Sequence, residues 1–518
     1  MTPLISENNN YNRNYVKYIA IFLLILVSLI IVPSSPLSKG NIWVDTNAML
    51  EIGRGWLSGN IPYLHMFEQR GPILFIYNLI ANVISSHGYF GLFCIEIANF
   101  LAIFFITDRI LMKCFNNSIN PFIATVLPFF MMIDKSFETG GSPEEFAITW
   151  SLLGILTAIS VSTEPMKNEF YRAVIFGITI GMVFWIKFTL LGPLIGASIF
   201  IFLFLLTHQR YKYLIKFVVD SLLSFSVMSS VICFYFFYHH ALKNLYNVYF
   251  KVNIMAYGGN TTINEKIISF INTSFQTITT NSWLFSLALA GIFILWRLQK
   301  KLAKLLLVVS LISFIVTYLV GQARLYSFLQ IYTILILIII ISTVALVNNI
   351  NKSYLWILLL LALFPIIQNP FFSKAPYIWS KNPVAPKLFG EIINRECSDA
   401  KLESLVYYNI VDAGVERYTP IKVSEKFKYF ERTNVPDKAY PEQKTYLDRI
   451  INNSEATYVV IGLNWGRQKS INLENNHEVE SKIPEQVQKK YKVISAGYSY
   501  YPVETDLNQF QLALLKKR

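Results

Sequence analysis

Long apolar segments separated by short basic turns constrain this chain more than any other feature. Runs such as Ile19 to Val32 and Ile331 to Val347 are about long enough to cross a hydrocarbon core of roughly 30 Å. Hydrophobic residues make up 54% of the 518 residues and charged residues only 15%, whereas a soluble domain carries about a quarter charged residues. The sequence therefore predicts a polytopic membrane protein and excludes soluble globular, disordered and collagen-like chains.

The positive charges indicate the orientation in the membrane. In the apolar part of the chain, Lys and Arg gather at Arg109/Lys113, Lys167/Arg172, Arg210 to Lys216 and Arg297 to Lys304. This is the positive-inside pattern of a bacterial inner (plasma) membrane protein, and it predicts that residues 1–17 are cytoplasmic. The formal net charge is +13, but no basic stripe with interleaved aromatics is present, so we expect no nucleic-acid partner.

Alternation of the apolar runs with these turns predicts an all-α membrane domain over residues 18–368, with about eleven transmembrane helices embedded in the bilayer. The predicted outer loops are 37–88, 133–146 and 239–280. Within the first loop, Pro72 to Ser86 is apolar but has no basic stop at its end, so we expect a helix at the outer interface.

The composition changes abruptly at about Asn369, after which charged residues become as frequent as in a soluble domain. Strand-like runs at Ser404 to Tyr408 and Thr457 to Gly462 alternate with helical stretches at Glu442 to Ile451 and Glu485 to Lys490. The pattern predicts a small extracytoplasmic α/β domain over residues 369–518.

Acidic residues are informative in a membrane domain, because a bilayer tolerates them only at its edges or in a polar cavity. The first two predicted outer loops contain Asp45, Glu51, Glu68, Asp134, Glu138, Glu144 and Glu145. This concentration predicts a polar site, and ordinary solvated loop charges are the alternative. Asp45 could also cap a helix over Asn47 to Leu57. Arg70 could either snorkel to lipid headgroups or bind one phosphate through two hydrogen bonds.

Four short motifs in these loops carry a resemblance to a known family. They are Asp45 soon after the first span, Ile61-Pro62-Tyr63, Glu68-Gln69-Arg70-Gly71-Pro72 and Gly140-Gly141-Ser142-Pro143-Glu144-Glu145. They resemble those of the bacterial GT-C glycosyltransferases, and more narrowly the branch of protein O-mannosyltransferases and aminoarabinose transferases. The resemblance covers roughly residues 15 to 370. It implies a sugar donor on polyprenyl phosphate and a cell-surface glycan or lipid acceptor outside the membrane.

The resemblance also implies roles for individual residues. Asp45 would be the catalytic base, Glu144 or Glu145 the second-loop acid, Arg70 and Lys187 the donor-phosphate contacts, Arg324 and Tyr326 further phosphate or sugar contacts, and Glu68 and Tyr63 acceptor or sugar contacts. The alternative for Lys187 is snorkelling at the interface. Many relatives have a His-Tyr pair where this chain has Ser327 and Phe328, so no histidine role is expected there.

The proposed chemistry suits these residue types. Phosphate is a reasonable leaving group, so a base for the acceptor hydroxyl and cations for the departing phosphate are enough for a single, inverting displacement. A divalent metal could bind the second-loop acid pair, but neither acid lies in a DxD arrangement, and we expect no essential cofactor. The favoured case is glucosylation of O-antigen in lipopolysaccharide. A transporter or flippase for a lipid-linked glycan is the alternative, and a non-catalytic scaffold of the cell envelope comes third.

Overall fold

The computed structural model describes thirteen stretches of the chain. They are residues 3–38, 41, 43–115, 119–164, 168–258, 262–320, 325–349, 384–397, 404–408, 412–423, 455–463, 471–501 and 508–518. Three features predicted from the sequence lie outside them: the eleventh span, Tyr354 to Gln368, the helix Glu442 to Ile451, and the candidate Arg324.

Seven helices in the described residues are long and apolar enough to cross a membrane. They are α1 (Pro3–Ile31), α4 (Phe90–Phe115), α6 (Pro143–Thr163), α7 (Glu169–Lys187), α9 (Tyr211–Tyr238), α14 (Lys300–Val320) and α15 (Leu329–Asn349). An eighth crossing is possible if α12 (Ile263–Thr280) and α13 (Ser282–Leu298), which meet at a bend of 87°, form one broken span.

Of the ten predicted spans that fall within the described residues, seven or eight meet the length and composition criterion for a membrane crossing. Two of the predicted spans form only short helices: α5 (Val126–Ile133), which follows the 3-10 turn η1 (Pro121–Thr125), and α8 (Gly192–Thr207). The 16 residues of α8 cover only about 24 Å at 1.5 Å per residue, which is less than the hydrocarbon core.

The predicted outer loop 239–280 is largely helical, which corrects its reading as a loop. It contains α10 (Leu242–Leu245), the π-helix η5 (Tyr246–Val252), α11 (Asn253–Gly258) and α12. A capping box starts α12: Thr262 Oγ accepts from Glu265 N at 3.2 Å, and Glu265 Oε2 accepts from Thr262 N at 2.7 Å. The Thr-x-x-Glu spacing is a helix-start signal that the sequence reading did not use.

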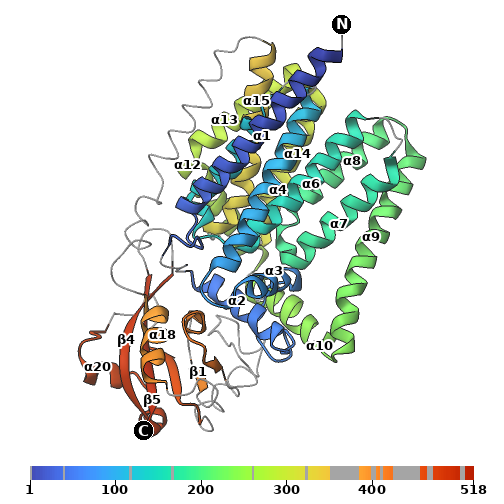
Figure 1. The fold of residues 1–518 in the computed structure, drawn as a ribbon. Helices are drawn as coiled ribbons and strands as arrows, with labels where there is room; N and C mark the ends of the chain where they lie inside the picture. The colour runs from blue at the N-terminus through green and yellow to red at the C-terminus, as the bar shows by residue number, and fades with distance from the viewer. Residues whose placement is uncertain are drawn as a thin grey trace.

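The basic turns of the helical domain gather at one end. There Arg13 and Lys17 bind Asp108 at 2.7 and 2.8 Å, and Arg172 binds Glu164 at 2.5 Å. At the other end lie α2 (Val44–Leu57), α3 (Pro72–Ile84) and the C-terminal domain (Figure 1). We call this the junction end.

The C-terminal domain contains a five-stranded sheet in the order β2-β1-β3-β5-β4. Its strands are β1 (Ser404–Tyr408), β2 (Lys422–Val423), β3 (Tyr458–Gly462), β4 (Tyr491–Tyr501) and β5 (Asn508–Lys517), and its helical elements are α18 (Ala385–Glu396), η8 (Gly414–Arg417), α20 (Asn476–Glu480) and α21 (Glu485–Lys490). Strand β1 pairs in parallel with β2 and β3, whereas β5 pairs antiparallel with β3 and β4. The predicted strands at β1 and β3 and the predicted helix at α21 are confirmed.

A continuous apolar cluster joins the two parts of the chain. Buried residues of α2, such as Ala48 and Ile52, belong to the same cluster as Phe389 of α18 and Val460 of β3. The C-terminal domain is therefore packed against the helical domain through shared core, and α2 lies at that boundary.

Candidate functional site

Asp45, Glu68 and Arg70 form one cluster at the junction end. The Arg70 guanidinium lies 2.6 Å from Asp45 Oδ2 through Nη2 and 2.8 Å from Glu68 Oε1 through Nη1. The Asp45 side chain is 8% exposed, that of Glu68 2% and that of Arg70 13%. Burial raises the pKa of Glu68 above its usual value, and Asp45 adds to this rise while Arg70 opposes it. One cation thus holds two carboxylates in a largely dry site.

Asp45 is not the N-cap of its helix, which corrects the alternative considered from the sequence. The N-cap of α2 is Trp43, without a side-chain capping bond, and Asp45 is the second residue of the first turn. A carboxylate in the first turn is favoured by the helix dipole. Its hydrogen bond, however, goes to Arg70 and not to the backbone of α2.

The segment that carries Arg70 is fixed against helix α7. Gly71 N donates to Ile186 O at 3.0 Å, and a Cβ at Gly71 would lie 2.0 Å from Trp185 O. Tyr63, which adopts a φ of 65°, donates its hydroxyl to Arg70 O at 2.6 Å. Only glycine allows this close approach, and it brings Arg70 beside the end of α7, where Lys187 is the last residue.

Lys187 and Glu144 form the second ion pair of the site. Lys187 Nζ lies 2.6 Å from Glu144 Oε1, and the Glu144 side chain is completely buried. The ammonium also lies 5.4 Å from the ring centroid of Tyr326, whose ring is 5.7 Å from that of Trp43. Lys187 is thus partly buried and held by a carboxylate and an aromatic ring of the protein.

Glu145 is engaged in holding the second loop. Its backbone N–H donates to the N-cap residue Ser142 at 3.0 Å, and its Oε2 accepts from Gly141 N at 2.7 Å. The loop turns sharply through Gly140 and Gly141, whose φ values are 78° and 77°. Thr46 of α2 then donates its hydroxyl to Gly140 O at 2.9 Å, which joins this loop to the helix of Asp45. Of the two candidate second-loop acids, Glu144 pairs with the candidate phosphate ligand Lys187 and Glu145 pairs with the loop backbone.

Sequence reasoning did not select Glu96, which lies in α4 beneath this loop. Glu96 has no exposed surface, and a Cβ at Gly140 would lie 2.2 Å from its Oε1. The sequence did contain a signal, because Glu96 is an acidic residue within the apolar run of the second predicted span. An acidic side chain in such a run normally faces a polar interior and not the lipid.

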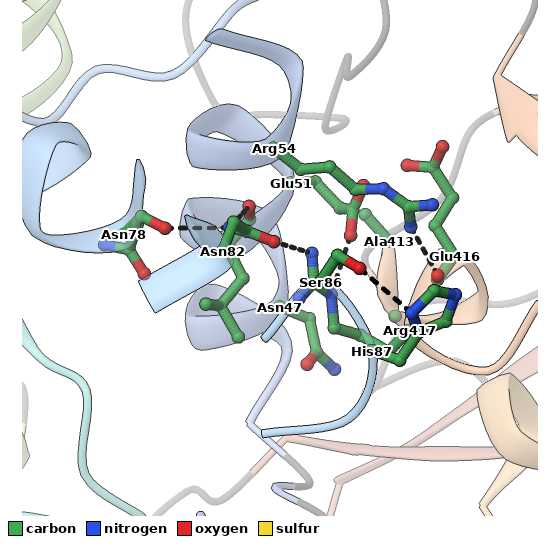
Figure 2. A network of polar contacts seen from close by, with 12 residues as sticks. Asn47, Glu51, Arg54, Asn78, Asn82, Ser86, His87, Ala413, Glu416 and Arg417 are labelled. Atoms are coloured by element: carbon green, nitrogen blue, oxygen red, sulfur yellow. Dashed lines mark hydrogen bonds and ion pairs between the residues drawn. The ribbon is translucent and has the colours of Figure 1, made fainter. Parts of the chain in front are cut away.

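Two other loop acids, Glu51 and Asp134, have their partners outside this cluster. Glu51 pairs with Arg417 of the C-terminal domain at 2.9 Å (Figure 2). Asp134 Oδ1 accepts from Ser136 N at 2.8 Å and so begins the short turn η2 (Lys135–Phe137). Within the described stretches, no three His, Cys, Asp or Glu side chains come together as potential metal ligands.

The arrangement offers paired cations and carboxylates at one edge of the helical domain. Arg70 presents a planar fork suited to a phosphate, and Lys187 adds a point charge. Asp45 is held at the first turn of α2 by Arg70 and can accept a proton. Such a set suits stabilisation of a departing phosphate beside a base.

Comparison with known proteins shows which solved structures share the fold of this chain. No protein-family model matches the chain, and no curated protein matches its sequence. ArnT from Cupriavidus metallidurans, solved with bound undecaprenyl phosphate, is 10% identical over 96% of this chain and 97% of that chain, with a TM-score of 0.54. Its apo state is 8% identical over 95% and 97% of the two chains, with a TM-score of 0.53.

The chain has a GT-C-like fold. The Archaeoglobus fulgidus oligosaccharyltransferase, solved with Zn and sulfate, is also similar, at 12% identity over 95% of this chain and 72% of that chain and a TM-score of 0.48. The fold class predicted from the short motifs is thus confirmed in its coarse form: a polytopic GT-C-like helical domain followed by a small mixed sheet.

Proposed function

We propose that this chain is a membrane glycosyltransferase that transfers one sugar from a polyprenyl-phosphate donor to a cell-surface glycan or lipid outside the cytoplasmic membrane. The observation that carries the proposal is the convergence of Asp45, Arg70, Lys187 and Glu144 at the junction end of a GT-C-like fold. ArnT, which shares this fold, has been solved with undecaprenyl phosphate. A lipid phosphate is the ligand that these two cations would suit.

In the proposed reaction, the oxygen of the acceptor hydroxyl attacks the anomeric carbon of the donor sugar. Asp45 accepts the proton that this hydroxyl loses. The bond from that carbon to the phosphate oxygen breaks, and the phosphate leaves with the bonding electrons. Arg70 and Lys187 stabilise its growing negative charge. Because the hydroxyl displaces the phosphate in a single step, the anomeric configuration inverts. Tyr326 would contact the phosphate or the sugar, and Arg324 would add a further phosphate or sugar contact. Tyr63, which donates its hydroxyl to Arg70 O, would help to orient Arg70.

A transporter or flippase of a lipid-linked glycan is the second candidate. Secondary transporters commonly place their substrate site near the middle of the bilayer, at discontinuous helices. Here the paired charges lie at helix ends: Asp45 in the first turn of α2, Glu144 in the first turn of α6 and Lys187 in the last turn of α7. This location favours the transferase.

Membranes that contain the chain, incubated with polyprenyl-phosphate [14C]glucose, test the proposal. We expect label to move from the lipid into a surface glycan or lipid, and Asp45→Asn to abolish this transfer at equal protein level. The control is Glu265→Gln, which neutralises an exposed acid of α12 that has only a capping role. The assay is repeated with donors that carry other hexoses. If the labelled lipid crosses the membrane but no label reaches an acceptor with any donor, the result favours the flippase.

A further inference from the structure

One face of α2 is bound to the C-terminal domain. Asn47, Glu51 and Arg54 share this face because their spacing is i, i+4 and i+7. Asn47 Nδ2 donates to Asp412 Oδ1 at 2.8 Å, the Arg54 guanidinium donates to Glu416 O, and Glu51 accepts from Arg417. Two turns of the helix are thus joined to residues 412–417. Figure 2 shows the contacts of Glu51 and Arg54 with Arg417 and Glu416.

Arg417 binds two helices at once. Its Nε lies 2.9 Å from Glu51 Oε1 on α2, and its Nη2 donates to Asn82 Oδ1 on α3 at 2.7 Å. Its carbonyl accepts from Gly88 N at 3.1 Å, and the residue is only 1% exposed. A single side chain of the C-terminal domain therefore links α2 and α3.

These two helices carry the candidate site. Asp45 is in the first turn of α2, and Arg70 lies two residues before α3. The helices touch closely, since a Cβ at Gly53 would lie 2.4 Å from the backbone carbon of Asn78. Glu51 is six residues from Asp45, or about 9 Å along the helix. A tilt of α2 at the Arg417 end would therefore displace Asp45 from Arg70.

We propose that Arg417 is a positioning residue for the transfer reaction, acting through α2 and α3 to hold Asp45 and Arg70 in register. This inference rests on the proposed function, which assigns Arg70 to the donor phosphate and Asp45 to the acceptor. A buried ion pair is often no more stabilising than apolar residues of the same volume, whereas its hydrogen bonds fix one orientation. The C-terminal domain is thereby part of the transferase site.

The test uses the full-length chain in detergent with undecaprenyl phosphate as the probe. The variants are Arg417→Met, Arg417→Lys, Arg70→Ala and the double variant, with Lys516→Met as the control. Lys516 pairs with Glu396 within the C-terminal domain at 2.8 Å and is remote from α2 in its contacts. Two quantities are measured: the Kd for undecaprenyl phosphate, and amide hydrogen exchange of residues 44–57 and 72–84.

We expect Arg417→Met to weaken binding of undecaprenyl phosphate about tenfold and to raise amide exchange in residues 44–57 and 72–84. Arg417→Lys should keep part of the affinity that Arg417→Met loses. Lys516→Met should change neither quantity. In the Arg70→Ala background, Arg417→Met should weaken binding no further, because Arg417 acts through Arg70. The inference would be overturned if the affinity losses of Arg417→Met and Arg70→Ala added fully in the double variant. It would also be overturned if Arg417→Met left amide exchange over residues 44–57 unchanged.

Two further results separate the possible failures. If Arg70→Ala does not weaken binding, the proposed phosphate role of Arg70 fails, and the positioning role is then decided by exchange alone. If Arg417→Met does not accumulate as folded protein, Glu51→Gln replaces it, since it removes the same charge pair and keeps the side-chain volume. Unchanged exchange and affinity in Glu51→Gln would also overturn the inference.

Discussion

At the scale of single residues, Asp45 makes one contact that decides its proposed role: its Oδ2 lies 2.6 Å from Arg70. Asn at this position keeps the size and a hydrogen-bond acceptor for Arg70 but cannot take a proton. We expect Asp45→Asn to accumulate normally and to lose transfer by about a hundredfold or more, the scale of general-base catalysis. Label transfer from polyprenyl-phosphate glucose in membranes of equal protein content measures this. Near-parental transfer would move the base to Glu144.

Arg70 tests the phosphate contact at the same scale. Loss of a charge-assisted hydrogen bond removes about 1.5 to 3 kcal/mol, or roughly 10- to 150-fold in Kd. Arg70→Ala should therefore raise the Kd for undecaprenyl phosphate by at least tenfold, as measured by titration in detergent. Arg70→Lys should recover only part, because an ammonium lacks the two-pronged geometry of the guanidinium. Full recovery with Lys would argue against a bidentate contact.

At the scale of elements, Gly71 joins the start of α3 to the end of α7. A methyl group there would meet Trp185 O at 2.0 Å, so Gly71→Ala must push the Arg70 segment away from Lys187. We expect weaker binding of undecaprenyl phosphate by at least tenfold and a lower Tm. Gly59→Ala is the control, since its φ of 89° imposes backbone strain while nothing lies within 4 Å of the added carbon. Equal losses of affinity in both variants would show that the loss does not depend on contact with α7.

The ion pair between α2 and the C-terminal domain predicts a pH dependence. Burial opposes ionisation of Glu51, but Arg417 and Arg54 outweigh it and hold its pKa below the usual 4.5. A lowered carboxyl pKa gives stability that is complete above pH 4.5 and is lost as the pH falls through the lower, folded value. The Tm gap between the parent and Glu51→Gln should thus be widest near pH 7 and shrink below pH 4.5. A constant gap from pH 7 to pH 3.5 would contradict this.

At the scale of the whole molecule, the basic turns and the junction lie at opposite ends of the helical domain. The positive-inside rule then predicts that the junction end, Asp45 and the C-terminal domain lie outside the cytoplasm. A reporter that is active only outside the cytoplasm should be active when fused after Arg518, and a cytoplasm-only reporter should be silent there. The same pair of reporters placed at Gln209, in the turn between α8 and α9, should give the reverse result. Activity of the cytoplasmic reporter after Arg518 would overturn the orientation.

The sequence by itself determined features that depend on local order. The apolar run from Pro72 predicted a helix there, which the structure shows as α3, and the strand-like run predicted the strand at Ser404–Tyr408. The motif around Arg70 indicated the GT-C-like fold. The helix and strand predictions succeed because propensity and hydropathy act over a few neighbouring residues.

Only the tertiary structure decided which charges meet. Glu51 looked like a site acid, yet it pairs with Arg417, 366 residues away, whereas Glu96, which was not selected, lies completely buried against the Gly140 loop. The Gly71 contact with α7 and the 87° bend between α12 and α13 are likewise fixed by packing. Ion pairing and close packing depend on distances between residues that are far apart in the sequence. Those distances are set only when the helices pack together, so a local residue pattern does not predict them.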